Sequence, residues 1–233
     1  GCSETVSSPA DSIWRRAVTQ YDLGEAESAI TKLDRLLLAS PDDAVVHNMR
    51  GLLHDEQQAH KLALDDFTQA IQFASEAGVP LCNRGVLRHK MGDLEGAIAD
   101  FDRASQLMSD SVIPQFYRGR SWEVSKAYQR ALNDYSSVLA TIPDTAIALC
   151  RRAMVYRQMQ QFPQAQQDLN AAAWAFVRHN NSGAARRTLQ LLKQWEQDSE
   201  VTGSGAGGSG LEPSDAGDQA SAILSPTVEH LAS

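Results

Sequence analysis

Small and large apolar residues recur along this chain with a period of 34 residues between residues 10 and 200. We number the positions of the period as phases, and phase 1 falls at residues 10, 44, 78, 112, 146 and 180. Phase 20 is always alanine: Ala29, Ala63, Ala97, Ala131 and Ala165. Phase 8 is glycine or alanine: Ala17, Gly51, Gly85, Gly119 and Ala153. Phase 24 is a large apolar residue: Leu33, Phe67, Phe101, Tyr135 and Leu169. A fixed period of this length is typical of stacked helix pairs that bury a continuous core between neighbours. The pattern therefore predicts an all-α, right-handed superhelical solenoid.

Each copy of the period divides into two helices, which we call helix A and helix B. In the third copy, helix A is expected near residues 79–91, the turn at Gly92 and Asp93, and helix B near residues 94–108. Five helix pairs and a capping helix are predicted, over residues 10–43, 44–77, 78–111, 112–145, 146–179 and 180–199.

Glycine and proline residues support these boundaries. Gly24 and Gly92 share phase 15, at the turn between the two helices, where a positive φ is useful and glycine costs least. Pro41 and Pro143 share phase 32, just past the expected end of helix B. Pro163 falls in the first turn of the fifth helix B, which tolerates a residue without an N–H group.

The two ends of the chain lack this periodicity. Residues 1–9 are expected to form a flexible tether, and residues 200–233 a Gly/Ser-rich disordered tail. Between the last helix pair and this tail, Ser182 is expected to cap the final helix. The apolar stripe of that helix is expected to contain Leu189, Leu192 and Trp195.

Composition narrows the classes of function. The 233 residues carry a net charge of −8, which argues against nucleic acid as a partner and against purely electrostatic attachment to an anionic membrane. Cys82 and Cys150 share phase 5 two repeats apart, too far for a disulfide, and are predicted to be reduced. No nucleophile elbow, phosphate-binding glycine loop or pair of zinc-spaced histidines occurs, so we expect no enzyme activity, no cofactor and no metal.

The third copy resembles the tetratricopeptide repeat. The resemblance rests on Asn83-Arg84-Gly85, on Met91-Gly92-Asp93 and on Ala97-Ile98-Ala99-Asp100-Phe101, and it extends over about four-fifths of the chain. Arginine at phase 7 makes it similar to the Arg-Gly subtype of this repeat. The resemblance implies a protein that binds peptides or proteins along a concave surface, which is lined chiefly by phases 2, 5, 9 and 12 of helix A.

Arginine at phase 7 is matched by aspartate at phase 23. The two series are Arg16, Arg50, Arg84, Arg118, Arg152, Arg186 and Asp66, Asp100, Asp134, Asp168. The favoured interpretation is a structural ion pair between helix B and a neighbouring helix A, and the alternative is an anion-binding row. The pattern leaves open whether each aspartate uses the arginine of its own repeat or of the next.

The concave surface supplies the candidate binding residues. It lacks the lysine and asparagine clamp with which chaperone-binding members of the family hold a carboxylate. Aromatic residues, methionine and arginine are enriched at interfaces, which favours one group of candidates over the others. The predicted contacts are Phe116, Tyr117, Arg120, Met154 and Arg157, together with Asn48 and Val86. The expected partner is an amphipathic helix or an extended apolar segment, although several of these side chains could instead pack between neighbouring A helices.

The sequence Gly1-Cys2-Ser3 is similar to the end of a bacterial lipobox, in which the cysteine is lipidated. The alternative is myristoylation of Gly1 with palmitoylation of Cys2, at the cytosolic face of a eukaryotic membrane. A soluble cytoplasmic protein is the third possibility. A bacterial envelope lipoprotein is favoured.

These observations predict a membrane-tethered adaptor, monomeric within a larger complex, that assists the assembly of a membrane or envelope machine. Two alternatives are a self-associating structural solenoid and a binding module that is occluded by its own C-terminal tail.

Overall fold

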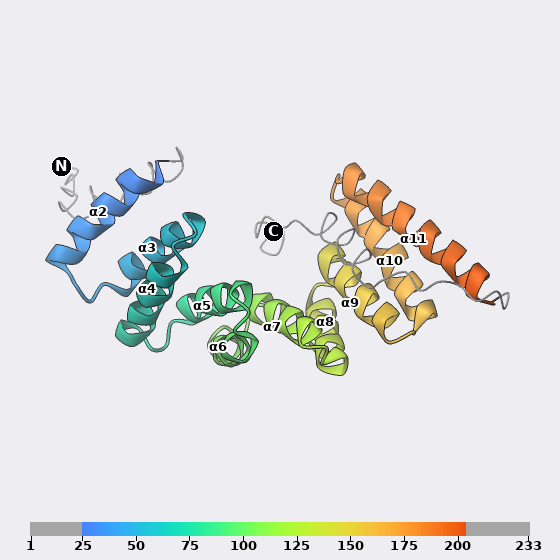
Figure 1. Ribbon diagram of the computed structural model, residues 1–233, viewed down its shortest axis with the longest axis horizontal. Coiled ribbons are helices and arrows are strands. Elements are labelled where there is room, and N and C mark those ends of the chain that lie inside the picture. Colours follow the sequence, from blue (N-terminus) through green and yellow to red (C-terminus); the bar gives the residue numbers. More distant parts are fainter. Residues whose placement is uncertain (1–24, 204–233) are drawn as a thin grey trace, which may run out of the picture. The chain divides into compact units, whose positions relative to one another are not determined.

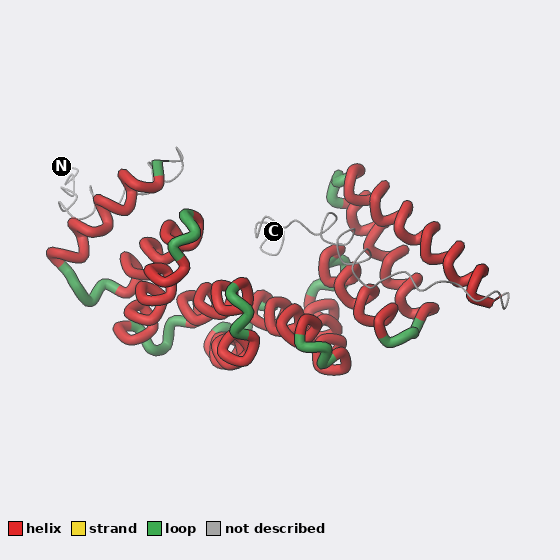
Figure 2. Tube along the Cα trace, viewed as in Figure 1, coloured by secondary structure: helices red, strands yellow, loops and turns green. Residues whose placement is uncertain are grey.

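The computed structural model describes residues 25–203, with side chains described as far as residue 197. Over this range the chain forms ten α-helices and no strand, which confirms the all-α prediction (Figures 1 and 2). The helices are α2 (Ala26–Ala39), α3 (Ala44–Glu56), α4 (His60–Phe73), α5 (Gly78–Lys90), α6 (Leu94–Leu107), α7 (Ile113–Val124), α8 (Tyr128–Thr141), α9 (Ala146–Gln158), α10 (Phe162–Arg178) and α11 (Ser182–Gly203). Odd-numbered helices from α3 to α9 are the predicted A helices, and even-numbered helices are the B helices. The right-handed twist of a superhelix stays a prediction.

The turns between helices A and B share one backbone conformation. Gly92 has a φ of +84°, and the N–H of Asp93 donates to the carbonyl of Arg88 at 2.9 Å. This is the hydrogen bond of a Schellman motif, in which the left-handed residue ends the helix. Non-glycine residues at the same phase of three other turns have a φ of 59°: Gln58, Lys126 and Gln160. Gly24 lies outside the described residues.

The apolar phases pack as the period predicts. The alanines at phase 20 and the large residues at phase 24 are almost completely buried in all four described pairs of helices. At phase 8, a Cβ atom added to Gly85 would lie 2.7 Å from Cε1 of Phe101, well inside van der Waals contact. Gly51 and Gly119 face the rings of Phe67 and Tyr135 in the same way.

The fifth pair shows how phases 8 and 24 depend on each other. Here phase 8 is Ala153, phase 24 is Leu169, and both residues are fully buried. The methyl group of alanine is accommodated where the facing residue is leucine, which lacks the reach of an aromatic ring. Helix A therefore approaches helix B closely in each pair, and one extra carbon on one helix is matched by a smaller residue on the other.

The structure confirms the arginine–aspartate pairs and identifies the partner of each. Arg84 donates through Nε and Nη2 to the two carboxylate oxygens of Asp100, at 2.9 and 2.7 Å. The same fork joins the arginine to the aspartate of its own repeat in Arg50–Asp66, Arg118–Asp134 and Arg152–Asp168. The four aspartates are buried. These residues are therefore committed to holding helix A against helix B, and they do not form an open anion-binding row.

A third member of this network lies at phase 25, where the sequence pattern had shown nothing. Nη1 of Arg50 donates to Asp34 of the preceding B helix at 2.7 Å. Nη1 of Arg84 and of Arg152 similarly reach the hydroxyl groups of Thr68 and Ser136. One guanidinium group thus ties its own helix pair to the B helix before it.

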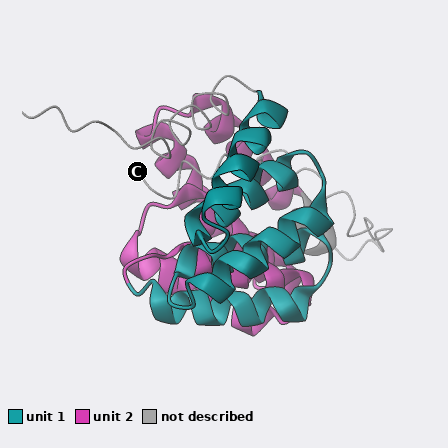
Figure 3. Cartoon of the chain, turned by 90° about the vertical axis from the view of Figure 1, so that its left-hand side faces the viewer, with its two compact units in different colours: residues 1–109 teal, residues 110–233 magenta. Residues whose placement is uncertain are grey.

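The described helices fall into two compact units, residues 25–109 and residues 110–203 (Figure 3). In the first unit, α3 packs on α2, α4 and α5, and α5 packs on α4 and α6. In the second, α9 packs on α7, α8 and α10, and α11 packs on α10. Each unit therefore stacks consecutive helices on one another, and both carry A helices side by side. No helix of the described range is both long enough and apolar enough to span a bilayer.

Two details of the last helix correct the expectations. The capping residue is Asn181, whose Oδ1 accepts from the N–H of Ala184 at 3.0 Å, because α11 already begins at Ser182. Trp195 is buried, as predicted, but Leu189 is exposed and Leu191 is buried in its place. The helix also continues to Gly203 rather than ending at 199, and it stops where the Gly-Ser-Gly sequence begins.

Candidate peptide-binding surface

In the first unit, the phases predicted to face a partner carry exposed aliphatic residues. Val45 and Leu52 lie seven residues apart on α3 and are 63% and 39% exposed. Val79, on the neighbouring helix α5, is 51% exposed, and Val86 is partly exposed. Residues seven apart lie on one face of a helix. We call Val45, Leu52, Val79 and Val86 the aliphatic strip.

The aliphatic strip is separate from the hydrophobic core. The residues that follow Val45 and Leu52 in the sequence, Val46 and Leu53, are buried and belong to the core between α2 and α3. Helix α3 is therefore apolar on two faces, and only one of them is covered within the described chain. An apolar face that packing does not require is the feature that marks an interaction surface.

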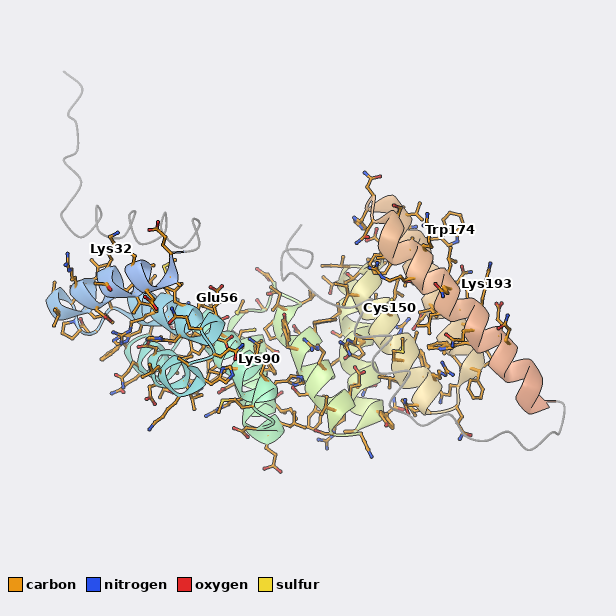
Figure 4. The ribbon with its side chains drawn as sticks, turned by 45° about the horizontal axis from the view of Figure 1, so that its top comes forward. Lys32, Glu56, Lys90, Cys150, Trp174 and Lys193 are labelled. Carbon is orange, nitrogen blue, oxygen red and sulfur yellow. The ribbon has the colours of Figure 1, made fainter. Side chains whose placement is uncertain are left out.

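Polar contacts hold the two helices of the strip in register. Nδ2 of Asn83 on α5 donates to Oδ1 of Asn48 on α3 at 2.9 Å. Lys90, at the end of α5 (Figure 4), forms an ion pair with Asp55 of α3. The predicted contact residue Asn48 is thus already engaged by its neighbour, and its first role is to fix the spacing between α3 and α5.

In the second unit, three of the predicted contacts are buried. Phe116, Tyr117 and Met154 are 2%, 6% and 9% exposed. The ring of Phe116 packs 5.9 Å from the ring of Tyr135, the large residue at phase 24. These three side chains therefore offer little surface to a partner and act mainly in packing between helices. The reason is size, because large apolar side chains gain the most from burial.

The two predicted arginines remain accessible in part and lie against aromatic rings. The guanidinium carbon of Arg120 is 5.5 Å from the ring centre of Tyr117, and that of Arg157 is 4.4 Å from the ring centre of Trp195. Both distances fit cation–π contacts. Trp195 was expected only in the cap, yet its ring lies beside a predicted binding residue.

Sequence reasoning missed Arg151, which lies on α9 at phase 6. Its Nη1 is 3.4 Å from Oε1 of Glu123 on α7, and the other oxygen of Glu123 accepts from the hydroxyl of Tyr135 at 2.7 Å. Phase 6 is also where Asn83 reaches across to the preceding A helix in the first unit. That equivalence was the signal available in the sequence, since both residues are polar and occupy the same phase.

Burial changes the protonation behaviour of several groups near these surfaces. Desolvation, and next the charge of Glu123, raises the pKa of Tyr135 well above its usual value. Desolvation, reinforced by the nearby charge of Arg151, lowers the pKa of Arg120. Burial raises the pKa of the Cys82 and Cys150 thiols to about 12. Both cysteines are free, as predicted, and both are protonated at neutral pH.

Solved structures with the same arrangement of helices identify the fold. Residues 15–78 match the tetratricopeptide repeat family in sequence. A crystal structure of MamA superposes with a TM-score of 0.66 at 13% identity, over 75% of this chain and 98% of that one. YrrB, described as a TPR protein with an unusual peptide-binding site, superposes with a TM-score of 0.62 at 20% identity, over 76% and 92%. The fold is a tetratricopeptide repeat solenoid.

A third similar structure is a tetratricopeptide repeat protein from Parabacteroides merdae, with a TM-score of 0.64 at 15% identity, over 79% of each chain. No curated protein matches this chain in sequence. The likeness to solved tetratricopeptide repeat structures therefore establishes the fold. Gly1 and Cys2, the predicted sites of lipidation, lie outside the described residues.

Proposed function

We propose that this protein is a non-enzymatic scaffold that binds a segment of a partner protein on the exposed face of its A helices. The observation that carries the proposal is the aliphatic strip. It combines exposed apolar side chains on two adjacent helices with two polar contacts that join the same helices, Asn48–Asn83 and Asp55–Lys90. A surface of this kind fits an amphipathic helix or an extended apolar segment, whose own apolar side chains would cover the strip.

The proposal is tested by selecting binders from a random peptide library on the full chain and measuring the affinity of the best peptides by fluorescence anisotropy. Val79→Asp places a charge on the strip and should weaken those peptides about tenfold or more, since a buried unpaired charge is costly at an interface. Leu38→Asp is the matched control. Leu38 is 84% exposed on α2, a B helix, and the same change there should leave the affinity within about twofold.

Two results would contradict the proposal. The first is that the folded protein selects no peptide. The second is that Val79→Asp and Leu38→Asp have the same effect on every selected peptide, which would place binding elsewhere. Both variants should retain the wild-type circular dichroism spectrum, because both positions are exposed.

We further propose that the scaffold works at a membrane, tethered through Cys2 or, alternatively, Gly1, and that it assists the assembly of an envelope or membrane complex. Support for the anchor comes only from the Gly-Cys-Ser sequence. Intact-mass spectrometry of the protein isolated from its native cell provides the test. A mass shift that matches an acyl or diacylglyceryl group on the N-terminal peptide is expected, and an unmodified N-terminal peptide would rule out both anchors.

A further inference from the structure

The second unit carries two classes of arginine. Arg118 and Arg152, at phase 7, each donate two hydrogen bonds to a buried aspartate of their own repeat. Arg120 and Arg151 have no such partner. Over residues 25–197, Arg120 forms no side-chain hydrogen bond or ion pair; its guanidinium group lies against the ring of Tyr117 and near the charges of Arg151 and Glu123.

Arg151 is only partly satisfied. Its Nη1 lies 3.4 Å from Glu123, which is long for a hydrogen bond between a guanidinium and a carboxylate. Its Nε is buried and has no hydrogen-bond partner within the described part of the chain. In the phase 7 arginine Arg152, by contrast, Nε donates to Asp168 at 2.7 Å. Buried donors are nearly always paired in folded proteins, so an unpaired Nε calls for an explanation.

The charges around the two arginines do not balance. Glu123 is the only carboxylate that contacts Arg151 in the described structure, and it is shared with the hydroxyl of Tyr135. Arg120 and Arg151 lie close enough for their charges to repel, and Arg120 is desolvated as well, which lowers its pKa. Two guanidinium groups and one carboxylate leave one positive charge in excess, on a protein whose net charge is −8.

The two arginines lie at phases that have counterparts on the surface described for the first unit. Arg120 is at phase 9 of α7 and Arg151 is at phase 6 of α9, on A helices that contact each other. In the first unit, phase 9 carries the exposed Leu52, and phase 6 carries Asn83, which bridges α3 and α5. Arg120 and Arg151 therefore occupy the positions of the second unit that correspond to Leu52 of the strip and to Asn83.

We propose that Arg120 and Arg151 together bind a carboxylate carried by an aspartate or glutamate side chain of the partner segment. This inference rests on the proposed function and names the chemistry that the second unit recognises. A carboxylate has two acceptor oxygens and matches the planar guanidinium group in a forked geometry. It would accept hydrogen bonds from the two guanidinium groups, cancel the excess charge and offset the repulsion between the two arginines.

The peptides selected on the full chain test this inference. A class of them should be enriched in aspartate or glutamate flanked by apolar residues. Arg120→Gln and Arg151→Gln should each weaken that class about tenfold or more, because truncating one partner of a desolvated charge pair is costly. Lys193→Gln is the matched control, since Lys193 is exposed on α11 (Figure 4) and the variant loses the same charge. It should change the affinity by less than about twofold.

A second measurement separates binding from stability. Because Arg120 and Arg151 repel each other, Arg120→Gln should melt at the same temperature as the wild type or higher. A lower melting temperature together with unchanged affinity for the acidic peptides would assign Arg120 a purely structural role and overturn the inference. Selection of apolar peptides without acidic enrichment would also overturn it, while leaving the proposed function intact. Selection of no peptide at all would count against the proposed function itself.

A phosphate could present similar oxygens, and competition distinguishes the two sources. Inorganic phosphate in millimolar excess should leave the bound acidic peptides in place. Phosphate could instead displace the peptides from the wild-type protein but not from Arg151→Gln. In that case the site is selective for phosphate, and the assignment to a side-chain carboxylate is wrong.

Discussion

Replacing Gly85 with alanine tests whether close approach of helix A to helix B limits the size of the residue at phase 8. Gly85 lies in the middle of α5, where alanine is intrinsically favoured by about 1 kcal/mol. Its new Cβ atom would lie 2.7 Å from Cε1 of Phe101, and 3.0 Å from two further ring atoms. Carbon atoms in contact prefer about 3.5–4.0 Å, and the ring of Phe101 is completely buried, so it has little room to move.

The gain in helix propensity and the cost of the close contact together set the expected change in the free energy of unfolding. Overpacking a well-filled core costs about 1–3 kcal/mol, which on average exceeds the gain in helix propensity. Gly85→Ala should therefore lower the free energy of unfolding by up to about 2 kcal/mol, measured by urea titration with circular dichroism. Gly183→Ala is the control, because the nearest atom to its added Cβ lies 3.6 Å away. The same substitution there should leave the stability unchanged or raise it by a few tenths of a kcal/mol.

A double-mutant cycle makes the test decisive. Phe101→Leu combined with Gly85→Ala reproduces the alanine–leucine pair found at Ala153 and Leu169. Each single substitution should destabilise the protein, and the double variant should be more stable than the sum of the two effects by about 1 kcal/mol or more. Strict additivity would show that the methyl group and the ring do not compete for one space, and it would refute the packing argument.

The remaining predictions address other contacts. Asp100→Ala leaves Arg84 without its buried partner and should lower the free energy of unfolding by about 3–5 kcal/mol, without changing the affinity for strip-binding peptides; an unchanged melting temperature with lost binding would contradict this. Gln160→Gly removes a non-glycine residue from a left-handed turn with φ of 59° and should stabilise by about 0.5–1 kcal/mol, whereas the same change at a right-handed surface position should destabilise. Burial raises the pKa of Cys150 to about 12, so its contribution to stability is complete below pH of about 9 and is lost as pH rises through about 12. Alkaline unfolding of Cys150→Ala should consequently begin at higher pH than that of the wild type, and coincident pH titrations would contradict the assignment.

The period of the sequence predicts most of the fold because every copy must bury the same face against the next. Helix α5 was expected near 79–91 and runs from Gly78 to Lys90, and α6 was expected near 94–108 and runs from Leu94 to Leu107. The choice of partner for Asp100 could not be predicted in this way, because the arginines of its own repeat and of the next lie at similar distances along the chain. Packing decides it: α5 and α6 are in direct contact, and Arg84 reaches the carboxylate from within the pair.

The candidate site was predicted less well than the fold. Phase identifies the face of a helix, but burial depends on the neighbouring side chains. Phe116 shares a phase with the partly exposed Asn48, yet it is buried because it meets the ring of Tyr135. Interface statistics favoured the aromatic residues of the second unit, whereas at the phases predicted to face a partner the exposed apolar side chains include Val45 and Val79 of the first.

The arginines show most directly how the same residue type serves two purposes in this chain. At phase 7, every described arginine of a helix pair meets a buried aspartate that recurs with the same period, so the charge is cancelled within the fold and nothing is left to recognise a ligand. Arg120 and Arg151 fall at other phases, where the repeat supplies no aspartate. Arg120 has no ion-pair partner in the described chain, and Arg151 shares Glu123 with the hydroxyl of Tyr135. A desolvated cation contributes little to folding without a counterion, so we expect a partner's carboxylate to complete the pairing of these two arginines. Pairing within the repeat separates structural charges from those that remain available for binding.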